Sequence, residues 1–409
     1  MGWVYNMFGD LRADRLPPYP LSELAEGVRL ARLSDVDVID FSQINPDAGA
    51  PSVAVDKTIQ SLLLPHHHRY SSSAGISSLR KKFAKFYGEH FNAELDSDSE
   101  VLVTMGVKEG LGHLLLAIAG AGDQIMTLTP SYPVHPAAVF LSGATSIPVS
   151  LYESWDEAEA LGYQLTDKSE SFFKRLHQLY EHAWPRPKAF IISFPHNPTT
   201  TTVTNSFFER LVEYAKVNGL YLLHDFAHAE VYLSKADAPS LLAIPGAKDC
   251  GVEFYSFSKS FQMPGWRVGF AAGNRKLISA LKRVKSYLDF GVFQPLQLGA
   301  QAALDKGLST VEESRVLYAE RREVLVSGLQ QLGWQIAPGR GSVFVWAKLP
   351  EAYRKRGGLA FSNQAVSEVG VAISPGSGFD LSAEEFCRFA LGESELRTRE
   401  GIKRLEKLG

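Results

Sequence analysis

A lysine, a serine and an arginine at short, fixed spacing are the residues of this chain that most clearly indicate a chemical function. Lys259 has Ser256 three residues before it and Arg267 eight residues after it. A lysine amine can attack a carbonyl group and form a Schiff base, whereas a hydroxyl and a guanidinium are typical ligands of a phosphate. The spacing therefore predicts a site for a molecule that carries both a carbonyl group and a phosphate.

Further polar or aromatic residues follow segments that are predicted to be β-strands. Short apolar runs over 101–104, 125–129, 190–194, 220–225, 253–258 and 269–273 alternate with amphipathic stretches such as 205–219. This alternation predicts an α/β fold with a mainly parallel sheet flanked by helices, in which ligands bind beyond the carboxyl ends of the strands. The residues expected there are Gly106, Val107, Lys108, Tyr132, Asn197, Asp225 and Lys259.

These residue types match the requirements of pyridoxal 5'-phosphate. The helix start at Gly106, Val107 and Lys108 offers free N–H groups to a phosphate, and GVKEGLG is neither a dinucleotide nor a Walker motif. Asp225 would keep the pyridine nitrogen protonated, so that the ring accepts electrons from the substrate. Lys259 would bind the cofactor as a Schiff base and would then move the proton between substrate and cofactor.

Composition and chain pattern bound the class of protein. The 409 residues include 42 basic and 45 acidic residues without a block of one sign, which favours a small-molecule partner over nucleic acid or a membrane. Cys250 and Cys387 are far apart, which predicts a reducing, cytoplasmic setting and neither a disulfide framework nor a structural metal. We predict that residues 1–55 join a small α+β domain formed by 295–409, and that 56–294 form a large cofactor-binding domain.

Several motifs together resemble a known family, and the resemblance covers nearly the whole chain. SFSKSFQMPGWRVGF (256–270) is similar to the S-x-S-K-x-x-x-M-x-G-W-R-x-G signature of class I/II, fold-type I pyridoxal-phosphate aminotransferases. PSYPVH (130–135), FPHNPT (194–199) and HDFAHAEVY (224–232) add to it in the same order, as do HRYSSSAGISSLR (68–80) and VTMGVKEGLGHL (103–114). Together they are most similar to the alanine and LL-diaminopimelate aminotransferase branch.

The resemblance implies an aminotransferase that moves an amino group between an L-amino acid and a 2-oxo acid. It implies a homodimer with shared active sites, in which Tyr70 reaches the partner subunit's phosphate. It also implies that Tyr132 stacks on the cofactor ring, that Asn197 binds the cofactor's phenolic oxygen, and that Arg388 binds the substrate α-carboxylate.

Three positions depart from the family pattern. His228 stands where the D-x-A-Y motif has a tyrosine, Ile44 replaces the glycine of G-N-P-D, and Ala74 replaces a common arginine. His228 could fill the tyrosine's place as a neutral donor or have a catalytic role, and Ile44 would narrow the space over the substrate. These departures leave a rival hypothesis, in which the scaffold catalyses elimination, replacement or carbon-carbon bond formation. A binding-only relative is disfavoured because Lys259 and Asp225 are both present.

Each of these residues also has a plain structural interpretation. Asp225 could cap a helix, Asn197 could be a turn residue, Tyr132 could be packed in the core, and Arg388 could pair with a surface glutamate. His66, His67 and His68 are consecutive and cannot easily converge on one metal ion, so they are expected to be loop residues. Tyr19 is a lid over the substrate or a packed anchor, and the sequence does not distinguish the two.

Overall fold

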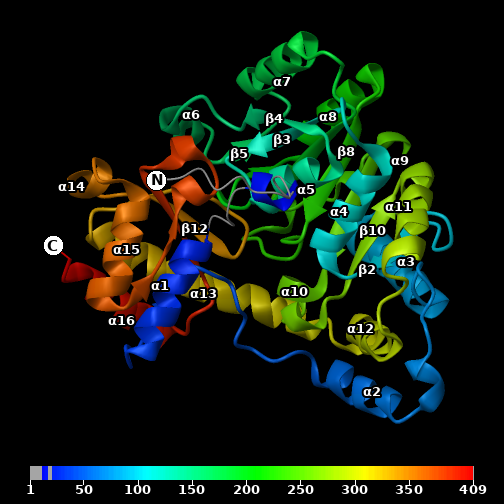
Figure 1. The fold of residues 1–409 in the computed structure, drawn as a ribbon, viewed down its shortest axis with the longest axis horizontal. Coiled ribbons are helices and arrows are strands. Elements are labelled where there is room, and N and C mark those ends of the chain that lie inside the picture. The colour runs from blue at the N-terminus through cyan, green and yellow to red at the C-terminus, as the bar shows by residue number, and fades with distance from the viewer. Residues whose placement is uncertain (1–11, 17–20, 409) are drawn as a thin grey trace, which may run out of the picture.

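The computed structural model describes residues 12–16 and 21–408, so Tyr19 lies outside the described residues. Within these ranges the main sheet has seven strands in the order β2-β10-β9-β8-β6-β3-β4 (Figure 1). The strands are β2 (Val101–Thr104), β3 (Gln124–Thr129), β4 (Thr145–Ser150), β6 (Ala189–Ser193), β8 (Tyr221–Phe226), β9 (Gly251–Ser256) and β10 (Gly269–Gly273).

The direction of the strands explains where functional residues gather. Neighbours from β4 to β9 pair in parallel, whereas β10 pairs antiparallel with both β9 and β2. The prediction of a mainly parallel sheet is therefore confirmed. Because β10 alone is reversed, its first residues lie at the edge where the other strands end. Ser256, the last residue of β9, pairs with Gly269, the first residue of β10.

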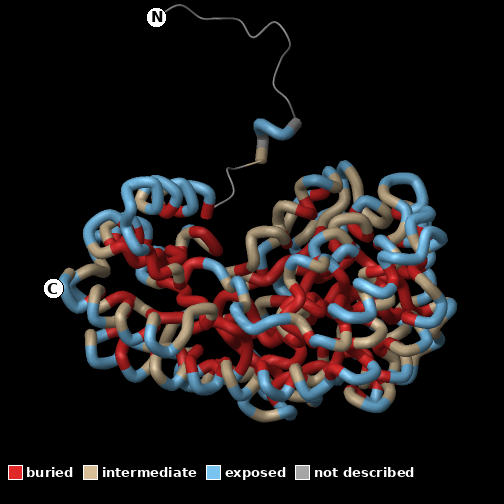
Figure 2. Tube along the Cα trace, turned by 90° about the horizontal axis from the view of Figure 1, so that it is seen from below, coloured by how far each residue is buried: buried red, intermediate tan, exposed pale blue. Residues whose placement is uncertain are grey.

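Helices cover both faces of this sheet. One face packs against α4 (Gly106–Ile118), α5 (Val134–Ser142) and α11 (Arg275–Leu288). The other face packs against α3 (Ser77–Phe91) and α12 (Gln294–Lys306) at one end, and against α7 (Glu170–His182), α8 (Asn205–Asn218) and α9 (Ala247–Cys250) at the other. α2 (Ser52–Leu62) lies beside α12 at the periphery. Buried stretches run through the interior and the outer turns are exposed (Figure 2).

Helix α8 shows how the sequence determines where a helix begins, which face is buried and where it ends. The Thr204 side chain accepts a hydrogen bond from the Phe207 N–H at 3.2 Å and so caps the first turn. Phe207, Phe208 and Leu211 form part of a stripe that is buried against the sheet. Gly219 ends the helix at φ 64°, a conformation that glycine adopts without strain.

A second sheet lies beside the first and contains most of the C-terminal part. Its order is β11-β12-β15-β14, formed by β11 (Gln335–Ile336), β12 (Phe344–Lys348), β14 (Ser374–Pro375) and β15 (Phe386–Ala390). The helices around it are α1 (Ser22–Leu33), α13 (Ser309–Gln331), α14 (Glu351–Arg354), α15 (Gly357–Val369) and α16 (Glu395–Glu406). β1 (Ile39–Asp40) pairs with β13 (Val371–Ala372), so the N-terminal part contacts this region. The division into domains at residues 55 and 294 stays a prediction.

Two details differ from the sequence-based expectations. β4 was not among the expected strands, because its exposed and polar positions do not form an apolar run. Residues 257 and 258 were expected in a strand, but β9 ends at Ser256 and α10 (Phe257–Ser260) begins there. The reason is local, since the Ser256 hydroxyl accepts a hydrogen bond from the Ser258 N–H at 3.1 Å and caps the new turn.

The remaining described elements are short. They are α6 (Trp155–Ala160), a pair of two-residue strands, β5 (Gln164–Leu165) and β7 (Thr202–Val203), and several 3-10 turns. A search of the described helices finds none that is long and apolar enough to cross a membrane.

Candidate active site

One cavity of about 480 Å³ collects most of the residues that the sequence predicted for the site. It lies at the edge of the main sheet where β2, β3, β6, β8 and β9 end. The predicted residues in its lining are Ile44, Val107, Lys108, Tyr132, Asn197, Asp225, His228, Ser256, Lys259, Arg267 and Arg388. Tyr70 is not among the lining residues, and its side chain is 91% exposed.

Lys259 lies in the first turn of α10, directly after the cap formed by Ser256. Its amine donates a hydrogen bond to the backbone carbonyl of Ile44 at 3.2 Å. Burial lowers the pKa of Lys259 to about 8, and the positive charges of Arg388 and Arg267 act in the same direction. A larger fraction of the amine is therefore unprotonated, and nucleophilic, than for an ordinary lysine at neutral pH.

Asp225 is held from two sides at the end of β8. Its Oδ2 accepts a hydrogen bond from Nε2 of His135 at 2.9 Å, and its Oδ1 accepts one from the Ala227 N–H at 3.1 Å. Burial raises the pKa of Asp225, but the hydrogen bond and charge of His135 outweigh burial and lower it. The carboxylate therefore stays ionised and can stabilise a positive charge in the cavity.

One end of the cavity is formed by the start of α4 and by Arg267. The first N–H groups of α4 have no carbonyl partner within the helix. Gly106 begins this helix at φ 78°, and a Cβ atom built there would lie 2.6 Å from Nη2 of Arg267. The guanidinium donates to the carbonyls of Pro264 at 3.0 Å and Met105 at 3.3 Å. Glycine is thus required for the close approach of Arg267 to the helix start.

Arg388 projects from β15 into the same cavity and is tightly packed. Its guanidinium lies over the rings of Phe344 and Phe379, at 3.9 and 4.5 Å from their centroids. It donates to Oδ1 of Asn197 at 2.9 Å and to the carbonyl of Ser42 at 2.8 Å. A guanidinium fixed in this way is suited to bind a carboxylate in one orientation. The interpretation of Arg388 as the partner of a surface glutamate does not agree with its burial.

His228 faces the cavity in place of the family's tyrosine. Burial lowers the pKa of His228 to about 3, and the positive charge of Lys259 contributes to this effect. The imidazole is therefore neutral around pH 7, and its Nδ1 lies 3.4 Å from the hydroxyl of Ser342. Ala74, the third departure, is buried outside the lining, and its carbonyl accepts a hydrogen bond from the Val103 N–H at 3.1 Å.

Some functional residues were not found from the sequence. His135 forms a hydrogen bond with Asp225, while Phe344 and Phe379 pack against the guanidinium of Arg388. His135 is the second residue of α5 and ends the PSYPVH motif (130–135), so its place shortly after Tyr132 and the end of β3 was a signal for its position. The two phenylalanines carry no such signal, because they come from the second sheet and its connections, far along the chain from the cavity residues of the main sheet.

The three consecutive histidines, His66 to His68, lie in a turn and contact residues close to them in the sequence. They form a 3-10 turn after α2, where His67 Nδ1 lies 2.6 Å from the Ser61 hydroxyl and His68 Nε2 lies 2.9 Å from the Leu62 carbonyl. Among the described residues, the group with possible metal-ligand atoms within 4.8 Å of one another is Glu109, His113 and Asp289, and it includes none of the three.

The lining fits pyridoxal phosphate on observations of this structure. A buried amine of lowered pKa can bind an aldehyde, and an ionised carboxylate can hold a protonated ring nitrogen. At the same edge a glycine-started helix and a guanidinium provide donors for a phosphate.

Comparisons with known proteins agree with this arrangement. Residues 36–405 match the family model described as aminotransferase class I and II. The chain is 40% identical over 397 residues to the glutamate-pyruvate aminotransferase AlaC of Escherichia coli (strain K12), covering 97% of this chain and 93% of that protein. It is 33% identical over 395 residues to the LL-diaminopimelate aminotransferase of Halothermothrix orenii, covering 97% of each.

The fold is also shared with solved structures. A single mutant of Thermus thermophilus aspartate aminotransferase superposes with a TM-score of 0.87 and 23% identity, covering 98% of this chain and 99% of that one. At this level of identity the likeness concerns the fold alone.

Proposed function

Given that this chain belongs to the class I and II aminotransferases, we propose that it transfers the amino group of a small, uncharged L-amino acid, alanine first of all, to a 2-oxo acid. The predicted family, its alanine and LL-diaminopimelate branch and its dependence on pyridoxal phosphate are confirmed. The residue roles and the choice of donor are the proposal. The observation that carries it is that Lys259 and Arg388 face one cavity.

We assign residues of the cavity to both ends of the cofactor, its aldehyde and its phosphate. Lys259 would bind its aldehyde covalently, Asp225 would pair with its ring nitrogen, and Tyr132 would stack on its ring. Gly106, Val107, Lys108, Ser256 and Arg267 would hold its phosphate. When bound, pyridoxal phosphate supplies an electron-accepting ring that stabilises negative charge at the substrate's Cα.

The protein's own side chains then account for binding and proton transfer. Arg388 binds the α-carboxylate and orients the substrate, since its guanidinium packs against the rings of Phe344 and Phe379 and is hydrogen-bonded to Asn197 and Ser42. Lys259, once released from the cofactor, accepts the Cα proton because its pKa is near 8. His228 remains neutral and acts as a hydrogen-bonding group.

The space over Lys259 supports a donor with a small side chain. Ile44 lines the cavity, and its carbonyl lies 3.2 Å from the Lys259 amine, so residue 44 is beside the reacting atoms. Besides Arg388 and Lys259, the described lining has two cations, Lys108 and Arg267, and both lie at the α4 end. The relative AlaC is named for glutamate and pyruvate, which fits alanine as the donor of one half-reaction.

The test is a half-reaction with purified, pyridoxal-loaded enzyme. The enzyme is mixed with alanine, glutamate or LL-diaminopimelate, each without a 2-oxo acid, and the cofactor and organic products are identified by mass spectrometry. We expect pyruvate and the aminated cofactor from alanine at the highest rate. Preference for LL-diaminopimelate would contradict the proposed donor. An altered amino acid with an unchanged cofactor would support the rival elimination or replacement chemistry.

A homodimer is the second part of the proposal. Tyr70 is almost fully exposed and its ring lies 5.3 Å from that of Phe290, while Tyr287 and Leu63 are 87% and 77% exposed. Such a group of exposed apolar side chains favours contact with a second copy. Light scattering should give twice the chain mass, and Tyr70→Phe should weaken cofactor binding if its hydroxyl reaches the partner's phosphate. The cytoplasmic location stays a prediction.

A further inference from the structure

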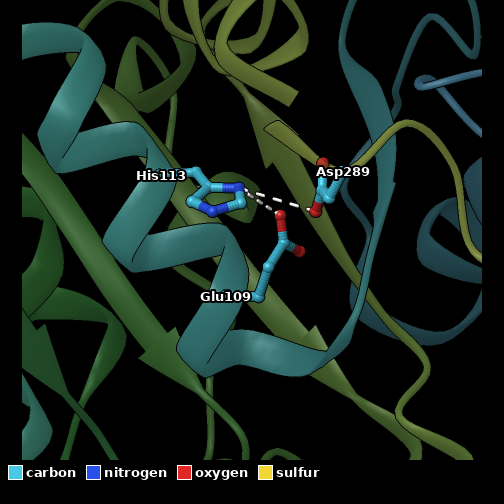
Figure 3. Close-up of side chains that lie close together, drawn as sticks. All are labelled: Glu109, His113 and Asp289. Carbon is cyan, nitrogen blue, oxygen red and sulfur yellow. Dashed lines mark ion pairs between the residues drawn. The ribbon is translucent and has the colours of Figure 1, made fainter. Parts of the chain in front are cut away.

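An ion cluster around one fully buried lysine lies directly behind the start of α4. It consists of Lys285, Glu109, Asp289 and His113, and we call it the Lys285 cluster. Lys285 has no exposed side-chain surface, and its ammonium donates to Glu109 Oε1 at 2.8 Å and to Asp289 Oδ2 at 3.1 Å. Figure 3 shows His113 directed toward both carboxylates, with its Nδ1 2.6 Å from Glu109 Oε1. The cluster joins α4 to the end of α11.

The ammonium of Lys285 already provides the cation of this cluster. Glu109, His113 and Asp289 could together offer metal ligands, but the ammonium lies within hydrogen-bond distance of both carboxylates. Burial raises the pKa of Glu109, but the contact with His113 and the charge of Lys285 outweigh burial and hold it at about 2. Glu109 is therefore a fixed carboxylate, and its function depends on what its second oxygen contacts.

The second oxygen of Glu109 contacts the backbone at the phosphate end of the cavity. Glu109 Oε2 accepts a hydrogen bond from the Met105 N–H at 2.8 Å. Met105 precedes Gly106, and its carbonyl accepts a hydrogen bond from Arg267 at 3.3 Å. A continuous path of contacts therefore runs from Lys285 through Glu109 and Met105 to the guanidinium in the cavity.

We propose that Glu109, held by Lys285, is a positioning residue that fixes the phosphate-binding turn at Met105 and Gly106 and thereby raises the affinity for the cofactor. This inference rests on the proposed placement of the cofactor phosphate at the start of α4. Glu109 binds the Met105 N–H on one side, while the first N–H groups of the helix, which have no carbonyl partner within it, are the donors proposed for the phosphate. Lys285 neutralises a carboxylate that would otherwise repel that phosphate.

The chain offers a matched control, Glu100, at the opposite end of β2 from Met105. Glu100 is also buried, and it accepts hydrogen bonds from the Asp96 N–H at 2.9 Å, Lys248 at 3.1 Å and Arg275 at 3.1 Å. Glu100 directly precedes β2, whereas Met105 directly follows it. Glu100→Gln therefore removes a carboxylate with the same kinds of contact, to a backbone N–H and a lysine, from the end of the strand that is remote from the cavity.

The experiment measures the dissociation constant of pyridoxal phosphate by dialysing each holoenzyme against graded cofactor concentrations. Glu109→Gln should raise this constant about tenfold, because a hydrogen bond from the turn to a charged group is lost. Glu109→Asp, which is too short to reach both Lys285 and Met105, should do the same and decides the question if Glu109→Gln does not fold. With saturating cofactor, kcat of both variants should stay within about twofold of the wild type.

Two controls make the result specific. Glu100→Gln and Glu100→Asp should leave the dissociation constant within about twofold of the wild type, since both keep the contact between Glu109 and Met105 and lie outside the Lys285 cluster. An unchanged constant in the Glu109 variants, or an equal rise in either control, would overturn the inference. Borohydride reduction of the wild type followed by peptide mass spectrometry tests the premise separately. If no cofactor is attached to Lys259 there, the proposed function fails rather than the role of Glu109.

Discussion

The guanidinium of Arg388 donates a hydrogen bond to the side-chain oxygen of Asn197 at 2.9 Å, and this contact joins the two sheets of the protein. Asn197 follows β6 of the main sheet, whereas Arg388 belongs to β15 of the second sheet. The proposed group for the substrate carboxylate therefore touches the proposed group for the cofactor's phenolic oxygen. A ligand bound at one of them would therefore lie directly beside the other.

Replacement of Arg388 should reduce the use of every amino acid donor. Arg388→Lys retains the charge but loses the planar, two-pronged geometry and the packing between Phe344 and Phe379. We expect a loss of about 3 kcal/mol in transition-state binding, roughly a hundredfold in kcat/KM, mostly through KM. Steady-state kinetics with alanine measures it, and Arg399→Lys on the exposed face of α16 is the control. A loss confined to one donor would contradict a role in binding the α-carboxylate.

The rate of cofactor attachment should depend on pH, and the midpoint of this dependence should lie near the pKa of Lys259. Because burial lowers the pKa of Lys259 to about 8, the free amine accumulates as the pH rises through 8. The rate at which apoprotein takes up pyridoxal phosphate should therefore increase from pH 7 to 9 and level off above it. Stopped-flow absorbance measures this rate. A midpoint near 10.5, the value of an exposed lysine, would contradict the assignment.

Ile44→Gly should widen the range of donors. Ile44 lines the cavity, its backbone carbonyl contacts the Lys259 amine, and its side chain packs against the core of the second sheet, so its removal opens space at that edge of the cavity. We expect the ratio of kcat/KM for leucine to that for alanine to rise about tenfold, with Ile44→Val giving a smaller change. The 2-oxo acid products are quantified by chromatography. An equal change for both donors would show that Ile44 affects the reaction without selecting the side chain.

His228→Tyr should leave the type of product unchanged. His228 is neutral because burial lowers its pKa to about 3, so it can supply a hydrogen bond as tyrosine does but not an acid at neutral pH. We expect less than about a tenfold change in kcat, and only the 2-oxo acid as product. Product analysis by mass spectrometry checks this. A shift from an eliminated or replaced product to a 2-oxo acid would instead tie His228 to a different chemistry.

Sequence reasoning brought together the cavity residues of the main sheet better than those of the second sheet. Lys259, Asp225 and Asn197 were predicted because the ends of parallel strands share one edge, which is a general property of the fold. Arg388 was identified only through a family resemblance, since it comes from another sheet and no local pattern relates the two. Lys285 could not have been found, because a lysine in an amphipathic helix is normally exposed. Its burial results from the packing of α4 against α11.

The pairing of Ser256 with Gly269 has a mechanical consequence. The segment that carries Lys259 and Arg267 leaves the main sheet at one of these residues and returns to it at the other. Its two ends are therefore fixed to the same rigid support, and the separation of amine and guanidinium is set locally. A rotation of the second sheet against the first would change the distance from Arg388 to Lys259 and leave the spacing of Lys259 and Arg267 unaltered. Substrate capture at Arg388 would then change without any change in the spacing of these two proposed attachment points of the cofactor.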